Sequence, residues 1–76
     1  MQVQKAINII IRRMKYYSDK ADMYVDMYCD FFNEHNELFA ELALDQSSEC
    51  CKIIACYQIL LYQLAKIQRR ERRNHG

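Results

Sequence analysis

The stretch DMYVDMYCDFFNEHNELFAELALD, residues 22–45, carries an acidic residue on nearly every helical turn and contains no lysine or arginine. Apolar and aromatic residues fill the places between the acids at three- and four-residue spacing, which is typical of an amphipathic helix. We interpret the acids as the solvated back of that helix. They are Asp22, Asp26, Asp30, Glu34, Glu37, Glu41 and Asp45.

The apolar spacing of this stretch extends back to the start of the chain, in steps that alternate between four and three residues. A 3.5-residue repeat keeps one helix face against a partner helix. His35 is the one polar member, and we expect it to be buried, hydrogen-bonded and important for register. The members are Val3, Ile7, Ile10, Met14, Tyr17, Ala21, Tyr24, Tyr28, Phe31, His35, Leu38 and Leu42, and Ile11, Val25, Phe32 and Phe39 widen the stripe.

These patterns predict an all-α fold in one domain, residues 1–76, because the chain has no proline and its only glycine is the last residue. The first helix is expected over about 3–43 and the second over about 47–72. The intervening LDQSS offers Asp45, Ser47 or Ser48 as the cap of the second helix. The second apolar stripe is Cys50, Ile53, Tyr57, Leu60, Leu64 and Ile67, flanked by Ile54 and Leu61.

The two expected helices form an antiparallel hairpin of unequal arms, in which residues 3–17 overhang. A second copy would cover the overhang, which predicts a homodimeric helical bundle with coiled-coil packing. The alternative is a three-helix bundle with a break near residues 17–20. The expected protein interface consists of Val3, Ile7, Ile10, Ile11, Met14, Tyr17, Tyr24, Tyr28, Phe31 and His35.

The charges are segregated along the chain although the net charge is only +1. Residues 1–20 carry +4, residues 21–51 carry −8 and residues 52–76 carry +5. A hairpin therefore has an acidic loop end and a basic open end. Such a rod is expected to pair antiparallel with itself or with another helical protein, because opposite charges set the orientation of association.

The basic end supports a second hypothesis, a regulator that binds nucleic acid, since basic clusters attract phosphates. Its expected contacts are Arg12, Arg13, Arg69, Arg70, Arg72 and Arg73. A membrane partner is disfavoured, because the longest uninterrupted apolar stretch, IIACYQILLYQLA (53–65), is shorter than the roughly 20 residues of a spanning helix.

The sequence favours no enzyme, metal site or cofactor. It contains no glycine-rich phosphate loop, and its cysteines at 29, 50, 51 and 56 lack the spacing of zinc ligands, so we interpret them as small buried apolar residues. No secretory signal is recognisable before Arg12, which predicts a cytoplasmic protein with reduced thiols. The first functional hypothesis is therefore a non-enzymatic interaction module, an adaptor, chaperone or regulator that acts through helix–helix association.

Overall fold

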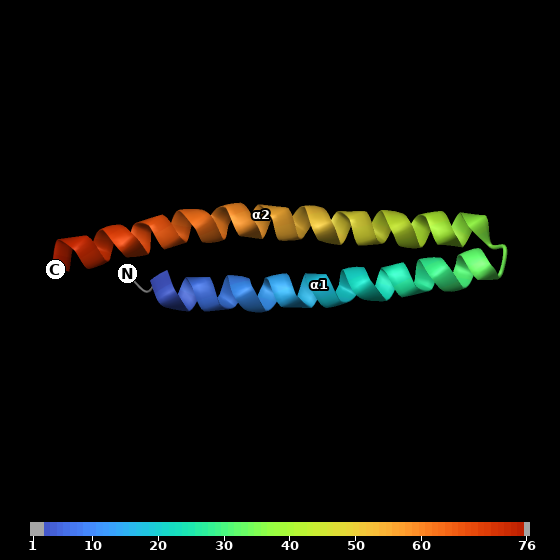
Figure 1. The fold of residues 1–76 in the computed structure, drawn as a ribbon, viewed down its shortest axis with the longest axis horizontal. Helices are drawn as coiled ribbons and strands as arrows, with labels where there is room; N and C mark the ends of the chain where they lie inside the picture. The colour runs from blue at the N-terminus through green and yellow to red at the C-terminus, as the bar shows by residue number, and fades with distance from the viewer. Residues whose placement is uncertain (1–2, 76) are drawn as a thin grey trace.

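The computed structural model of the chain is an antiparallel hairpin of two long helices (Figure 1). The structure describes residues 3–75: α1 spans Val3–Asn33 and α2 spans Glu37–His75. The Cα atoms extend over 61 × 14 × 13 Å, and their radius of gyration is 17.7 Å. A compact domain of this length would have a radius of gyration of about 11 Å. The molecule is therefore an elongated rod of two helices with a cross-section of similar width in both directions.

The turn at residues 34–36 is built by complementary caps on the two helices. The His35 amide donates to the Phe32 carbonyl at 3.1 Å and the Asn36 amide donates to the Phe31 carbonyl at 2.8 Å. With His35 at a φ of 60°, these bonds form a Schellman motif that closes α1. Asn36 then begins α2, because its Oδ1 accepts a hydrogen bond from the Phe39 amide at 3.4 Å.

This turn corrects the predicted helix boundaries of 3–43 and 47–72. The apolar spacing continues through residues 34–36 without interruption, so it could not reveal a turn there. The local signal was polar: His35 tolerates the left-handed conformation better than most residues, and Asn36 is a preferred N-cap. The segment expected to be the loop, around Asp45 and Ser47, lies inside α2.

The earlier turn also removes the predicted overhang of residues 3–17. With α2 beginning at Glu37, the return arm is long enough to reach Val3, which is only 3% exposed. Ile7 and Ile10 are likewise buried within the single hairpin. The alternative of a third helix is also wrong, because α1 continues through residues 17–20 without a break.

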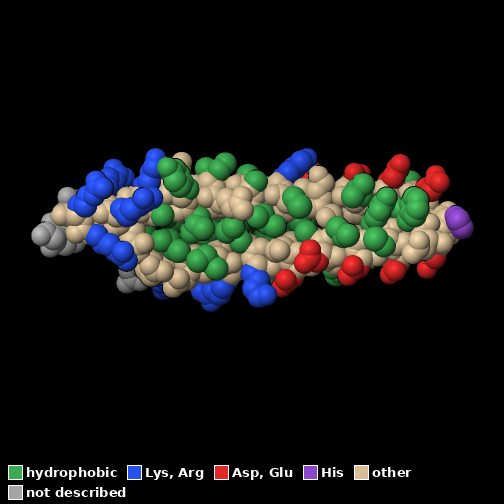
Figure 2. Space-filling view, in the orientation of Figure 1, with side chains coloured by type: hydrophobic (Ala, Val, Ile, Leu, Met, Phe, Trp, Pro, Cys, Tyr) green, Lys and Arg blue, Asp and Glu red, His purple; other side chains and the backbone are tan. Residues whose placement is uncertain are grey.

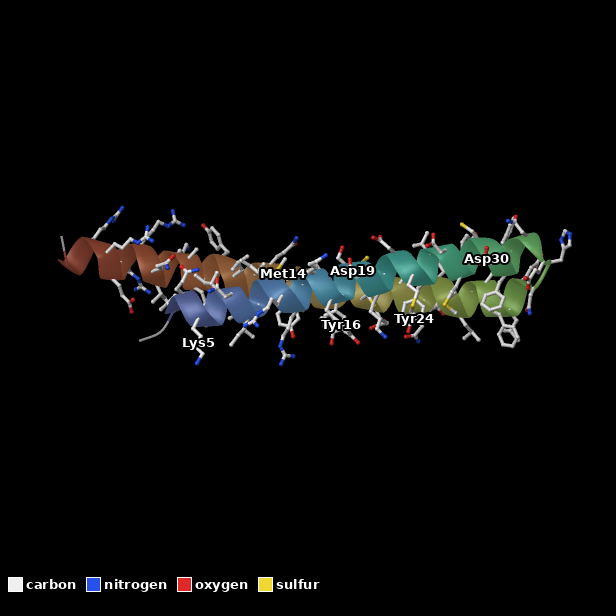
Figure 3. The ribbon with its side chains drawn as sticks, turned by 90° about the horizontal axis from the view of Figure 1, so that it is seen from below. Lys5, Met14, Tyr16, Asp19, Tyr24 and Asp30 are labelled. Atoms are coloured by element: carbon white, nitrogen blue, oxygen red, sulfur yellow. The ribbon has the colours of Figure 1, made fainter. Side chains whose placement is uncertain are left out.

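The predicted stripe of α1 is confirmed from Val3 to Phe31 as the side that faces α2. Every member of it is buried or half-buried, whereas His35 lies in the turn and is exposed, contrary to its predicted burial. Figure 3 shows α1 crossing in front of α2 at a shallow angle, the arrangement of helices packed through a 3.5-residue repeat. The stripe consists of Val3, Ile7, Ile10, Met14, Tyr17, Ala21, Tyr24, Tyr28 and Phe31.

The side chains in the facing stripe of α2 increase in size from the turn to the open end. Near the turn it holds only small residues, and towards the open end larger ones take over. The predicted stripe differs at one position, because Leu60 is 43% exposed while the predicted flanking residue Leu61 is half-buried. The other predicted members are buried or half-buried: Cys50, Ile53, Tyr57, Leu64 and Ile67. The members of the facing stripe are Ala40, Ala43, Ser47, Cys50, Ile54, Tyr57, Leu61 and Leu64.

The two helices approach closely where Ala21 meets Ser47. Both residues are buried, and the Ser47 hydroxyl donates to the Ala21 carbonyl at 3.2 Å. A hydroxyl only one carbon away from its own backbone reaches a neighbouring helix only when the helices lie close together. Ser47 was predicted as a helix cap, and its actual role is this contact between helices.

We expect His35→Gly to stabilise the hairpin by about 1 kcal/mol, because glycine adopts a positive φ without the steric cost that a Cβ brings. Thermal unfolding followed by circular dichroism measures the change. Arg12→Gly, at an exposed interior position of α1, is the control and should destabilise by a similar amount, because arginine is a strong helix former. A loss of stability for His35→Gly would mean that residue 35 is helical.

We expect Ser47→Leu to destabilise the hairpin by about 1–3 kcal/mol, because the larger side chain cannot fit against Ala21. The neighbouring Ser48 is exposed, so Ser48→Leu should change the free energy of unfolding by less than about 0.5 kcal/mol. Urea denaturation of both variants tests this. Equal effects at the two serines would contradict the close approach of the helices at Ser47.

Candidate interaction surface

The hairpin leaves many large apolar side chains in contact with solvent, because two helices packed together bury only the facing stripe of each. The structure encloses no large side chain completely among its described residues. These exposed apolar side chains suggest an interaction surface. They are Ile9, Ile11, Tyr16, Met23, Val25, Met27, Phe32, Leu38, Phe39, Leu42, Leu44, Ile59, Leu60 and Tyr62.

One side of the hairpin, which we name the Met27 face, carries a row of apolar side chains from both helices. Near the turn, Met27 of α1 and Phe39 and Leu42 of α2 line a shallow groove over the packed residues Tyr24 and Phe31. Helical spacing extends this side along both helices, and Figure 3 shows Tyr16 and Tyr24 projecting from the same edge of the rod. The face consists of Tyr16, Met23 and Met27 of α1 and Phe39, Leu42, Ile53 and Leu60 of α2.

The opposite side, which we name the Leu44 face, is less apolar. Phe32 and Leu44 line a groove there together with the carboxylates of Glu37 and Glu41. Spacing along α1 adds Ile11 and Val25 to this side. Its groove therefore combines exposed apolar area with negative charge at the rim, whereas the groove of the Met27 face has no acidic lining residue.

The two ends of the rod have opposite charge, as the sequence predicts. Figure 2 shows the basic side chains gathered over the open end and the acidic ones over the turn end. The structure pairs Lys15 with Asp19 at 3.6 Å and Lys52 with Glu49 at 3.1 Å, and all four side chains are largely exposed. Most charges of either end are thus free to interact with another molecule.

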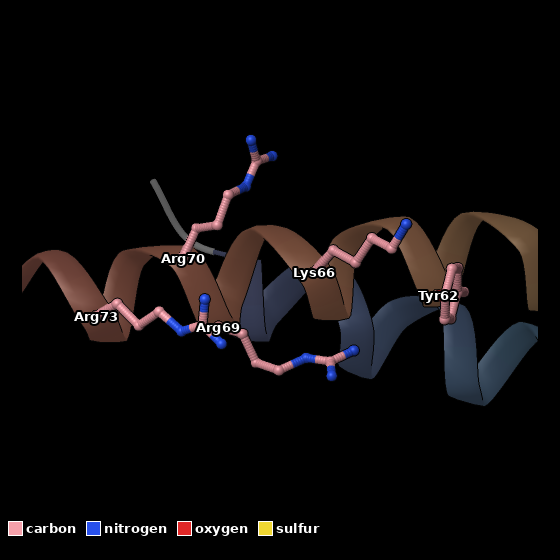
Figure 4. Close-up of a pocket in the computed structure, with 5 residues that line it drawn as sticks. All are labelled: Tyr62, Lys66, Arg69, Arg70 and Arg73. Carbon is pink, nitrogen blue, oxygen red and sulfur yellow. The ribbon is translucent and has the colours of Figure 1, made fainter.

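The open end carries a basic groove on α2. Tyr62, Lys66, Arg69, Arg70 and Arg73 line it, and Figure 4 shows these side chains arranged along successive turns of that one helix. The Lys66 ammonium lies 4.7 Å from the centre of the Tyr62 ring, a cation–π contact. The groove can accept an anion, because four cations surround it.

The structure brings only some of the predicted nucleic-acid contacts together in one groove. Arg69, Arg70 and Arg73 share the basic groove, whereas Arg72 is absent from its lining and Arg12 and Arg13 belong to α1. Sequence reasoning did not assign Tyr62 and Lys66 to this site. Helical spacing could have placed them there, because Lys66 precedes Arg70 by four residues and Tyr62 precedes Lys66 by four.

The residues of the predicted protein interface differ in their burial within the hairpin. Val3, Ile7 and Ile10 are covered by α2, so they belong to the interior of the hairpin. The half-buried members contact α2 while keeping part of their surface in solvent. These are Met14, Tyr17, Tyr24, Tyr28 and Phe31, while Ile11 and His35 are exposed.

The cysteines differ from their predicted burial. Cys50 is buried against α1, but Cys29, Cys51 and Cys56 are exposed. Within the described part of the chain, no group of three or more His, Cys, Asp or Glu residues is placed to hold a metal ion. Three of the four thiols therefore lie on the surface, and only the thiol of Cys50 belongs to the core.

Among the described residues, one helix is long and apolar enough to cross a membrane. It covers Glu37–Arg73, with a mean hydropathy of 1.3 over its most apolar 18-residue window, of which 6% is buried inside the hairpin. The sequence argument counted only an uninterrupted apolar stretch and so missed this window. One such helix is weak evidence for a membrane span, but its exposure shows how much apolar surface the hairpin leaves open.

Comparison with known proteins finds no match: no protein family matches the chain, and no curated protein or solved structure is significantly similar to it.

Proposed function

We propose that the protein is a non-enzymatic interaction module that binds another helical surface with the exposed sides of its hairpin. The observation that carries the proposal is the row of exposed aromatic and aliphatic side chains on both sides of the helix pair. Large exposed apolar patches commonly mark protein interfaces, and aromatic residues contribute much of the energy at such sites. An adaptor, chaperone or regulator of the cytoplasm would use the surface in this way.

The shape of the molecule supports binding rather than catalysis. A hairpin has no layer that could enclose a substrate, and the described grooves are open to solvent along the rod. Rigid helices do present side chains in fixed rows, which is what recognition of a partner helix requires. The charged ends would then select the orientation of that partner.

The double variant Phe32→Ser/Phe39→Ser, with one substitution on each face, should abolish association. We expect the tagged chain, isolated under native conditions, to have the mass of a complex by light scattering and the double variant to have the mass of one chain. Ile59→Ser is the control, because Ile59 is 62% exposed and lies outside both grooves. A wild-type chain that is isolated alone as a monomer would contradict the proposal.

A second candidate function is binding of single-stranded nucleic acid at the open end. The basic groove favours it, because aromatic rings next to cations are the usual surface for stacked bases and phosphates. Tyr62 is 58% exposed and borders the cluster of arginines. The RNA backbone would lie along this groove of α2.

Arg69→Gln/Arg70→Gln should weaken binding of a labelled single-stranded RNA by more than Arg12→Gln/Arg13→Gln, which removes the same charge from α1. Fluorescence anisotropy at several salt concentrations measures both affinity and its salt dependence. The slope of log K against log salt should fall by about 0.7 for each phosphate that the variant no longer neutralises. Absence of binding by the wild-type chain at low salt would exclude this function.

A further inference from the structure

We propose that the Met27 face is the docking site of a second copy of this chain, which binds turned end for end. The inference rests on the proposed function and names its partner, the face used and the orientation. The result would be a four-helix assembly in which each copy presents the same surface to the other, as a twofold interface requires.

The apolar side chains of the Met27 face extend along much of the rod. Met27, Phe39 and Leu42 form its widest part near the turn, where the opposing residues of α2 in the hairpin stripe are small. Tyr16 and Leu60 extend it towards the open end. A single hairpin cannot cover this row, because each helix has already used its facing stripe to bind the other.

The position of the charge boundary on the two helices favours end-for-end pairing. The sign changes between residues 20 and 21 in α1 and between residues 51 and 52 in α2. Both boundaries lie close to the contact of Ala21 with Ser47, so the net charge of each half of the rod has the same sign on both helices. A second copy in the same direction would place acid on acid, whereas an end-for-end copy places the basic half of each rod against the acidic half of the other.

Charged residues at the rim of the Met27 face are placed as end-for-end pairing requires. Helical spacing from Met27 and Met23 puts Arg13 and Asp30 on the same side of α1. They lie eight and nine residues on either side of Ala21 in the sequence. A twofold axis passing near Ala21 would therefore bring Arg13 of each copy towards Asp30 of the other.

The grooves of the two faces differ in their acidic residues. The groove of the Leu44 face is lined by Glu37 and Glu41, which would be desolvated beneath a docked helix. The groove of the Met27 face has Gln46 as its only non-aromatic polar lining residue. Burial of a carboxylate without a partner is costly, so the groove of the Met27 face is the one that an apolar contact can cover.

Leu42→Glu should dissociate the assembly, and Leu44→Glu should leave it intact. The two leucines are 51% and 49% exposed and line opposite grooves, so the variants match in chemistry and exposure. Analytical ultracentrifugation of the purified chain without any other macromolecule is the measurement. We expect a dimer whose dissociation constant rises about 10-fold or more in Leu42→Glu and changes less than about 3-fold in Leu44→Glu.

The orientation is tested by carbodiimide coupling of lysines to carboxylates in an assembly of the Arg13→Lys variant, with the products mapped by mass spectrometry. End-for-end pairing about an axis near Ala21 brings position 13 of one copy near Asp30 of the other, and both positions lie on the Met27 side of α1. Within one copy they are 17 residues apart on the same helix, a separation of about 26 Å. A product that joins position 13 to Asp30 therefore comes only from two copies.

The outcomes are distinct. A purified chain that stays monomeric overturns the inference, and the proposed function survives if the natively isolated chain still carries a partner that Phe32→Ser/Phe39→Ser releases. Equal dissociation by Leu42→Glu and Leu44→Glu overturns the choice of face. A dimer of the Arg13→Lys variant that gives no product between position 13 and Asp30 overturns the orientation.

Discussion

The contact between the two facing stripes of α1 and α2 is the constraint on which the rest of the molecule depends. A pair of helices shares one interface, so each helix buries a single stripe and exposes the remainder. The chain is 51% hydrophobic, more than one stripe on each arm can hold. The exposed rows on either side of the rod follow directly from this excess of apolar residues over available interface.

The stripe also determines where the helices come close together. Small residues on α2 face the aromatic residues Tyr24, Tyr28 and Phe31 of α1 near the turn, and this complementarity of size lets the rings fill the space between the helices. The Phe31 and Phe39 rings lie 5.5 Å apart and join the stripe to the Met27 face. Packing inside the hairpin and the shape of its outer surface are thus set by the same aromatic cluster.

The fold could be predicted from the sequence as far as its class, its two-helix topology and the stripe of α1. The position of the turn could not, because the apolar repeat runs through it and the polar signal from His35 and Asn36 is weak beside an unbroken periodicity. That single error displaced both helix boundaries and created an overhang at residues 3–17 that does not exist. The separation of charge into two ends did follow correctly, since it depends only on antiparallel arms and not on where they join.

The surface was harder to predict than the fold because exposure depends on the exact rotation of each helix. A rotation by one position exchanges Leu60 with Leu61, and a stripe drawn through the wrong one assigns interface residues to the interior. The basic groove shows the same limit: the arginines are obvious in the sequence, but the grouping of three of them with Tyr62 and Lys66 appears only on the folded helix.

The Schellman turn has a kinetic consequence. Residues near it contact one another across short loops, and each later pair along the arms is separated by a longer segment of chain, up to the Gln4–Gln68 hydrogen bond at the open end. Short loops close fastest, so the arms should zip from the turn outwards and fray from the termini inwards. The acidic half would then be the first part of the rod to form and the last to melt.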